Sequence, residues 1–288
     1  GSVLPTQYYD GQLTLMNFGS TRKFYLLGAA NNTGTEALRH IDHVLLSQDD
    51  AIPVNLGQQA STPRLFGEEP TIAEFAEARS NFNNDKLASF NAILRPHEKL
   101  KIKLLTFANS KNNSYEQSAI TDFNIQEYTF TNKELINQRH KSNSLFSRLE
   151  LHYDLSKSAT LAYFGNVNLG NKDKDARSLF NSTTAHEDVH EDLRMTSHTV
   201  NFTKKINERS AFVSSLRMIQ QRSPSSYFVD NYQFADLFSA TNLAHVQQDV
   251  QSKVSYYGLM GHYIYRRKIN QVFSATIATE LNDNTFQS

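Results

Sequence analysis

Residues 186 to 190, with the sequence His-Glu-Asp-Val-His, form the one segment of the chain whose residue types and spacing match a catalytic motif. On a helix, the pattern H-E-x-x-H places two imidazoles one turn apart. His186 and His190 would then bind zinc, and Glu187 would act as the base that activates a water molecule. On this motif alone, the chain would be a zinc metalloprotease.

The surroundings of the motif favour a different interpretation. Asp188, Glu191 and Asp192 crowd it with acid, no long apolar helical pattern surrounds it, and no third ligand is evident downstream. We therefore predict neither a catalytic site nor a metal centre, and we interpret the segment as the tip of a polar loop. Adventitious metal binding by His186 and His190 stays open as the alternative.

Composition excludes several other kinds of chemistry. The chain contains no cysteine, so disulfides, thiolate metal sites and cysteine nucleophiles are excluded. No Ser-His-Asp spacing, phosphate-binding glycine loop or pair of carboxylates rises above chance. The 29 basic residues balance the 29 acidic residues, so the basic surface of a nucleic-acid-binding protein is absent. We predict that the chain is not an enzyme and has no cofactor and no nucleic-acid partner.

Short stretches in which apolar and polar residues alternate dominate the sequence. Such alternation predicts β-strands, because successive side chains of a strand point to opposite faces. The stretch 149–155 shows it best: its odd-numbered residues are Leu, Leu, Tyr and Leu, whereas Glu150, His152 and Asp154 are polar. One face of each strand is therefore expected to be apolar and the other to face water.

About ten such strands form five hairpins, and the connections between strands alternate in length. Five connections are short and polar: 19–21, 95–98, 156–158, 207–209 and 266–268. Four are long and polar: about 31–85, 109–144, 168–194 and 222–253. This alternation is typical of an up-and-down transmembrane barrel, with tight periplasmic turns and long extracellular loops. We predict an all-β fold, in which residues 1–288 are a single segment of an antiparallel transmembrane β-barrel.

Two of the predicted loops carry patterns of their own. The segment from Thr35 to Gln48 has apolar residues at helical spacing, which predicts a short amphipathic helix. The segment from Phe123 to Phe130 is expected to extend the second loop as a strand or hairpin. Loops of this length suit large outer-membrane barrels better than a narrow pore, so the ten strands are expected to be part of a bigger wall.

Several polar residues are expected to face the lumen of such a barrel. Lys101 and Lys103 alternate with leucine and isoleucine and would project inward, where basic rings favour anionic solutes. Alternatively, they are merely the water-exposed side of a strand. His152 and His198 are also expected on the polar face, where they would line water.

Four tyrosines near the C-terminus offer a membrane interpretation and a soluble one. The residues are Tyr256, Tyr257, Tyr263 and Tyr265. In a membrane barrel they would belong to the aromatic belt at the membrane interface. In a soluble sheet the same residues would pack a core.

Parts of the chain resemble a family of outer-membrane proteins. The stretch 24–34, with the sequence FYLLGAANNTG, resembles the early barrel hairpin of TonB-dependent-receptor-like proteins of the Bacteroidetes. The stretches 81–91 and 98–103 are similar to the next hairpin of the same family. The resemblance runs loosely over almost the whole chain, and its motifs are degenerate.

Membership would imply an outer-membrane location and uptake of a nutrient ligand, which could be a glycan, a peptide or a metal chelate. It would imply contact with the lipid bilayer, with a plug domain or further barrel strands, with a surface lipoprotein and with TonB. Neither a plug pattern nor a coupling box precedes Gly11, so the chain matches the barrel wall only. A soluble or surface-exposed β-sandwich for binding or adhesion is the alternative.

Overall fold

The structure, a computed structural model, describes residues 8–33, 82–125, 128–230, 245–268 and 271–288. Within these ranges every regular element is a β-strand. The strands are β1 (Asp10–Phe18), β2 (Arg22–Asn31), β3 (Phe82–Asn83), β4 (Asp85–His97), β5 (Leu100–Ile125), β6 (Tyr128–Ser156), β7 (Ala159–Phe180), β8 (Thr183–Asn207), β9 (Ser210–Asp230), β10 (His245–Lys268) and β11 (Gln271–Gln287). Among the described residues no helix is long and apolar enough to cross a membrane.

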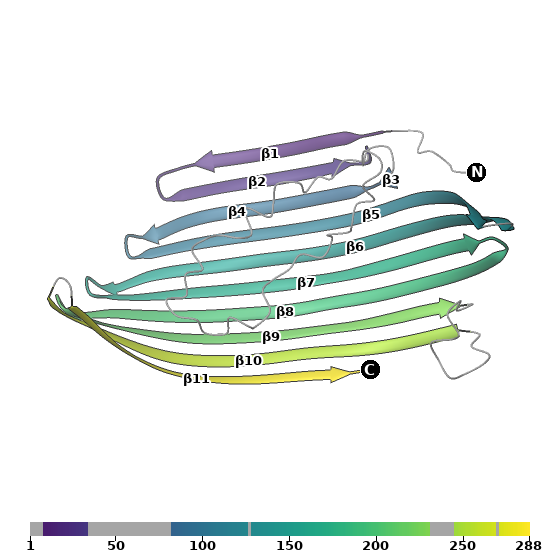
Figure 1. Cartoon of the computed structure of the whole chain (residues 1–288). Helices are drawn as coiled ribbons and strands as arrows, with labels where there is room; N and C mark the ends of the chain where they lie inside the picture. Colours follow the sequence, from purple (N-terminus) through teal and green to yellow (C-terminus); the bar gives the residue numbers. More distant parts are fainter. Residues whose placement is uncertain (1–7, 34–81, 126–127, 231–244, 269–270) are drawn as a thin grey trace.

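The strands form one curved sheet in which each long strand lies beside the long strand that precedes it in the chain (Figure 1). The order is β1-β2-β4-β5-β6-β7-β8-β9-β10-β11, every pair is antiparallel, and the two-residue β3 pairs with β5. The predicted all-β, up-and-down arrangement of about ten strands is confirmed. Among the described strands, β1 and β11 form the two edges and the sheet is open. A β-sandwich needs two stacked sheets, and the described residues form a single one.

Four short turns at one end of the sheet join alternate pairs of strands (Figure 1). Residues 19–21, 98–99, 157–158 and 208–209 connect successive strands, close to the predicted turns. The fifth predicted turn, 266–268, belongs mostly to β10, and the connection itself (269–270) lies outside the described residues. In the first turn the Gly19 N–H donates to the Arg22 carbonyl at 2.8 Å. A Cβ at Gly19 would lie 2.9 Å from that oxygen, so this turn requires glycine.

The prediction of loops over 109–144 and 168–194 was wrong, because nearly all described residues in these ranges belong to paired strands. β5 and β6 stay paired up to Ile125 and Tyr128, so the described residues of the segment from Phe123 to Phe130 lie at the ends of these two strands. β7 and β8 stay paired up to Phe180 and Thr183. These strands were not predicted because both of their faces are mainly polar. The alternation of apolar and polar residues, which was used to predict strands, is therefore missing.

The other two predicted loops are only partly described. In the segment 31–85, residues 34–81 lie outside the described residues, including the predicted helix from Thr35 to Gln48. In the segment 222–253, β9 continues to Asp230 and β10 begins at His245, and residues 231–244 lie outside the described part. Residues 222–230 and 245–253, which were predicted to be loop, therefore belong to paired strands.

Cross-strand register divides the side chains into two faces. We call the face that carries Leu149 and Leu151 the outer face, and the face that carries Phe146, Arg148 and Glu150 the inner face. In the part of the chain that the structure describes, the buried hydrophobic side chains larger than alanine all lie on the inner face: Leu87, Phe107, Phe146, Leu193, Met195, Val213, Ile219, Val229, Tyr256 and Met260. Because side chains on a concave surface crowd together, this burial identifies the inner face as the concave one.

Candidate functional site

The outer face carries an apolar band next to the short turns. On β6 the outward positions from 145 to 155 are Leu, Ser, Leu, Leu, Tyr and Leu, and three of them, Leu145, Tyr153 and Leu155, are among the exposed large hydrophobics. In register they adjoin outward residues of the neighbouring strands: Ile102 and Leu104 on β5, Tyr163 and Val167 on β7, Val200 and Phe202 on β8. The band continues through Leu216, Leu259 and Ile277 on β9, β10 and β11.

The width of this band matches a membrane, whereas the strands are far longer. A bilayer-crossing strand of a barrel needs about 9 to 11 residues, and the band on β6 spans a stretch of that size. β5 to β10 have 21 to 29 residues each. The remainder of each strand continues beyond the band, with polar residues on both faces. The sheet thus has two parts: one carries the apolar band on its outer face, and the other, which we call the extension, carries polar residues on both faces.

A cluster of charges lies on the inner face, behind the apolar band. The carboxylate of Glu150 forms ion pairs with Lys103, whose Nζ is 2.8 Å away, and with Arg148, whose Nε is 3.1 Å away, and it lies 3.8 Å from His152 Nε2. The side chains of Arg148 and Glu150 are only 5% and 6% exposed. One buried carboxylate therefore holds three basic groups together. This confirms the predicted facing of Glu150, His152 and Lys103 away from the leucines.

A hollow with a basic lining adjoins this cluster at the β4–β5 turn. Its volume is about 480 Å³. The residues that line it are Arg95, Glu98, Lys99, Leu100, Lys101, Lys103, His152 and Asp154. Four of these are lysine or arginine and two are acidic, so the hollow favours anionic groups. Lys101, predicted to face the lumen, is part of this lining.

The prediction for His198 was wrong, and Tyr256 does not lie in an interfacial belt. His198 lies on the outer face, in register with Gly165 and Met218, and its Nδ1 is 2.8 Å from the hydroxyl of Tyr163. That bond satisfies a polar ring within the apolar band. Tyr256, for which the sequence left an interfacial belt and a packed core open, lies on the inner face and is 2% exposed, because it alternates with Tyr257. Tyr256 packs with Leu193, Met195 and Ile219, so part of the inner face is apolar. The prediction that this face is polar and faces water did not include such a cluster.

The motif at 186–190 does not have the geometry of a metalloprotease. Residues 183–207 form strand β8, and four residues of a strand separate His186 from His190 by about 13 Å. Glu187 points to the inner face, where its Oε1 accepts from Lys174 Nζ at 2.8 Å. The two histidines and the glutamate therefore cannot share one zinc ion, and a polar hairpin takes the place of the predicted loop tip.

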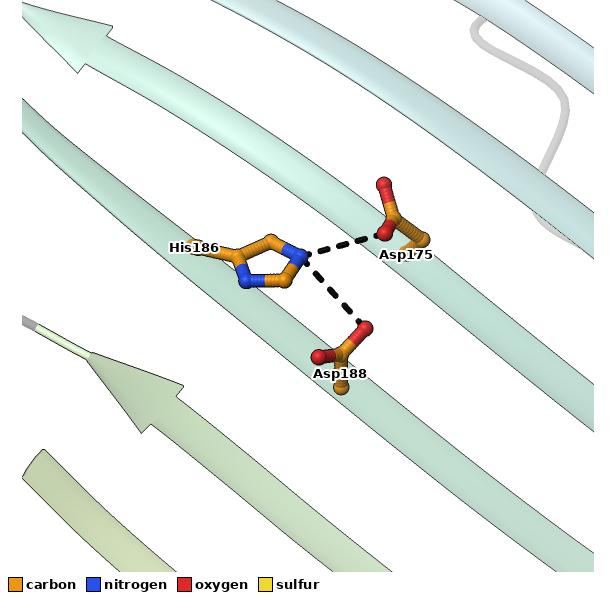
Figure 2. A group of neighbouring side chains, drawn as sticks. All are labelled: Asp175, His186 and Asp188. Carbon is orange, nitrogen blue, oxygen red and sulfur yellow. Dashed lines mark hydrogen bonds and ion pairs between the residues drawn. The ribbon is translucent and has the colours of Figure 1, made fainter.

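Each of the two histidines instead lies between two aspartates on the outer face of the β7–β8 hairpin. The carboxylates of Asp175 and Asp188 lie 3.1 and 3.5 Å from the same nitrogen of His186, Nε2 (Figure 2). Asp175 and Asp188 are directly opposite each other in the register of β7 and β8. Among the described residues these three form a group whose ligand atoms all lie within 4.8 Å of one another. The sequence did not indicate this group because it depends on the register of β7 against β8.

His190 is arranged differently. Its Nδ1 lies 2.5 Å from Asp173, and its Nε2 lies 3.7 Å from Asp192. The hydrogen bond with Asp173 and the negative charge of both aspartates raise the pKa of His190 above its ordinary value of 6.5, against the opposing effect of burial. Each carboxylate thus has its own ring nitrogen, an arrangement that suits a protonated imidazole.

Comparisons with known proteins give structural likeness at very low sequence identity. No protein-family model and no curated protein matches the chain. The ferric preacinetobactin receptor BauA from Acinetobacter baumannii is 10% identical, with 97% of this chain and 53% of that chain covered and a TM-score of 0.37. The ferric yersiniabactin uptake receptor FyuA from Yersinia pestis is 7% identical, with 90% and 44% covered and a TM-score of 0.35.

The toluene transporter TbuX from Ralstonia pickettii is 9% identical, with 95% of this chain and 80% of that chain covered and a TM-score of 0.30. The chain spans about half the length of the two receptors. TM-scores and identities of this size assign neither a ligand nor a mechanism.

Proposed function

We propose that the chain is part of the wall of an outer-membrane transport barrel. The observation that carries this proposal is the apolar band of the outer face, which has the width of a bilayer and lies opposite a polar and charged inner face. A soluble sheet exposes a large apolar surface only at a cost, whereas hydrocarbon is the natural environment of such a band. The inner face would then line the path of a solute.

The basic hollow on the inner face supports a preference for anionic ligands. Lys101, Lys103 and Arg95 line it, and a low-dielectric wall behind them strengthens their field. A peptide carboxylate, an acidic glycan and an anionic metal chelate all carry the required negative charge. Passage would involve no bond chemistry by these residues.

The resemblance of the stretches 24–34, 81–91 and 98–103 supports a finer proposal. We infer a TonB-dependent type of nutrient uptake, of the Bacteroidetes kind. Its partners would be the lipid bilayer, a plug domain or further barrel strands, a surface lipoprotein and TonB. The bilayer would contact the apolar band of the outer face, and the other partners would act in the transport cycle.

Flotation with lipid vesicles tests the membrane location. The purified chain, refolded from denaturant in the presence of vesicles, should float with them in a density gradient and should resist extraction by alkaline carbonate. Without lipid or detergent it should aggregate, because the outer band would be exposed to water. A chain that stays monodisperse in plain buffer and sediments apart from the vesicles would contradict the proposal.

A further inference from the structure

The outer face of the β7–β8 hairpin carries a group of side chains that a transport wall does not require. We propose that Asp175, His186 and Asp188 bind one divalent transition-metal cation there, with Zn²⁺ as the representative ion. The site lies on the extension, beyond the apolar band, and goes beyond the proposed function. Its failure would leave the membrane location untouched.

The first reason is that two carboxylates converge on one nitrogen. His186 Nε2 lies 3.1 Å from Asp175 Oδ2 and 3.5 Å from Asp188 Oδ1 (Figure 2). A ring nitrogen carries one hydrogen or one lone pair, so it cannot form a good hydrogen bond with both carboxylates. A single cation among the three atoms would satisfy the nitrogen lone pair and both oxygens together.

The second reason is the spacing of the ligand atoms. Ligands about 2.0 to 2.2 Å from a zinc ion lie about 3 to 3.5 Å from one another in tetrahedral or octahedral geometry. The two nitrogen-to-oxygen separations, 3.1 and 3.5 Å, already have this size, and all three atoms lie within 4.8 Å. A small rotation of the aspartate side chains would complete the triangle.

The third reason is electrostatic. Asp175 and Asp188 face each other directly across the strand pair, and like charges in this position destabilise a hairpin. The positive groups nearest in register are Arg139, opposite Asp175, and Arg177, opposite His186. The Nε of Arg139 donates to Asn112 Oδ1 at 3.2 Å. A cation between the two carboxylates would remove the repulsion at its source.

The backbone and the exposure of the site are suited to an ion from solution. The N–H of His186 donates to Asp230 Oδ1 of β9 at 2.5 Å, which fixes the position of this residue on the strand. The side chain of His186 is 30% exposed and those of Asp175 and Asp188 are about half exposed. A hydrated cation can therefore reach the three ligands without any opening of the sheet.

The ligand set indicates the class of metal. One imidazole nitrogen and two carboxylate oxygens suit zinc, manganese, cobalt or nickel, whereas calcium and magnesium prefer oxygen ligands alone. Three protein ligands leave further positions for water. The neighbouring histidine supplies a matched control, because each of its two carboxylates, Asp173 and Asp192, lies at a different ring nitrogen of His190.

Calorimetric titration with zinc chloride tests the proposal. The full chain in detergent micelles, without an affinity tag, should bind one equivalent of Zn²⁺. His186→Asn and Asp188→Asn should each weaken binding by at least about tenfold, since even outer-shell changes cost that much. His190→Asn and Asp192→Asn should leave the affinity and the stoichiometry unchanged.

Proteolysis of the same samples gives a second measurement. Zn²⁺ should slow cleavage within the β7–β8 hairpin in the wild-type chain and in His190→Asn, and should have no such effect in His186→Asn. Either of two results would overturn the proposal: no zinc binding at micromolar concentrations in the wild-type chain, or equal losses for the His186 and His190 substitutions. A variant that unfolds is recognised by circular dichroism, and Asp175→Asn then replaces it.

Discussion

Glu150 connects the charges of the inner face. Its side chain is almost fully buried, and it is paired with the equally buried Arg148 and with Lys103. Burying a carboxylate is costly unless positive groups and hydrogen bonds surround it, and this carboxylate has three basic neighbours. The cluster therefore matters more to stability than an ion pair at the surface would.

Replacement of this one carboxylate is predicted to be strongly destabilising. Glu150→Gln removes the negative charge beside the buried Arg148 and Lys103, which should lower the free energy of unfolding by about 3 kcal/mol. Urea unfolding in detergent micelles, followed by circular dichroism, measures this change. Glu208→Gln, at the exposed β8–β9 turn, is the control and should change the free energy by less than about 0.5 kcal/mol. Equal effects of the two substitutions would contradict this role of the cluster.

For single residues, the sequence predicted the face of the sheet on which a side chain lies better than it predicted the residues that the side chain contacts. Alternation along 149–155 placed Glu150 and His152 correctly, because the stretch is long and strictly periodic. It failed for His198, whose stretch has polar residues on both faces. The partners of His186 could not be predicted, since Asp175 becomes its neighbour only through the register of two strands whose polar sequences do not specify one.

At the scale of the strand, β6 combines two environments in one element. Its C-terminal part, 145–155, has an apolar outer face, whereas its N-terminal part is polar on both faces. The boundary between the two parts coincides with that on β7, since Leu145 pairs with Leu169 and Asn143 pairs with Asn171. The edge of the apolar band thus lies at the same level on the neighbouring strands β6 and β7.

A charge on the outer face of β6 should be far more damaging than one on its inner face. Leu151→Arg places a guanidinium in the apolar band and should cost about 2 to 4 kcal/mol for folding into vesicles. His152→Arg, one residue along, stays on the inner face and keeps a basic group beside Glu150. Folding yield into vesicles, measured over a urea series, compares the two. A larger loss for His152→Arg than for Leu151→Arg would contradict the assignment of the faces.

At this scale the apolar-faced strands and the short turns were predictable, and the extensions were not. The predicted turns at 156–158 and 207–209 lie within a residue of the observed ones, because strand alternation stops on both sides of them. The extensions over 109–144 and 168–194 have no apolar face to bury. Backbone hydrogen bonds hold these strands together, and such bonds form with almost any type of residue, so the sequence does not reveal them.

At the scale of the whole molecule, the described residues form a meander of ten long strands in one open, curved sheet. Its concave face buries aromatic, aliphatic and charged side chains together, and its convex face carries the apolar band. The up-and-down order was predictable because short turns recur at regular spacing. The curvature and the mixed inner face were not, since they depend on how neighbouring strands twist and on which side chains meet.

The central claim is that the apolar band of the outer face meets hydrocarbon while polar residues of the inner face behind it meet water, and single tryptophans can test it. The chain has no tryptophan of its own, so Leu151→Trp and His152→Trp each introduce one fluorophore. In vesicles that contain brominated lipid, we predict strong quenching of the tryptophan at 151 and weak quenching at 152, with the opposite order for aqueous iodide. If brominated lipid leaves the tryptophan at 151 unquenched, or iodide quenches both positions equally, the account is contradicted.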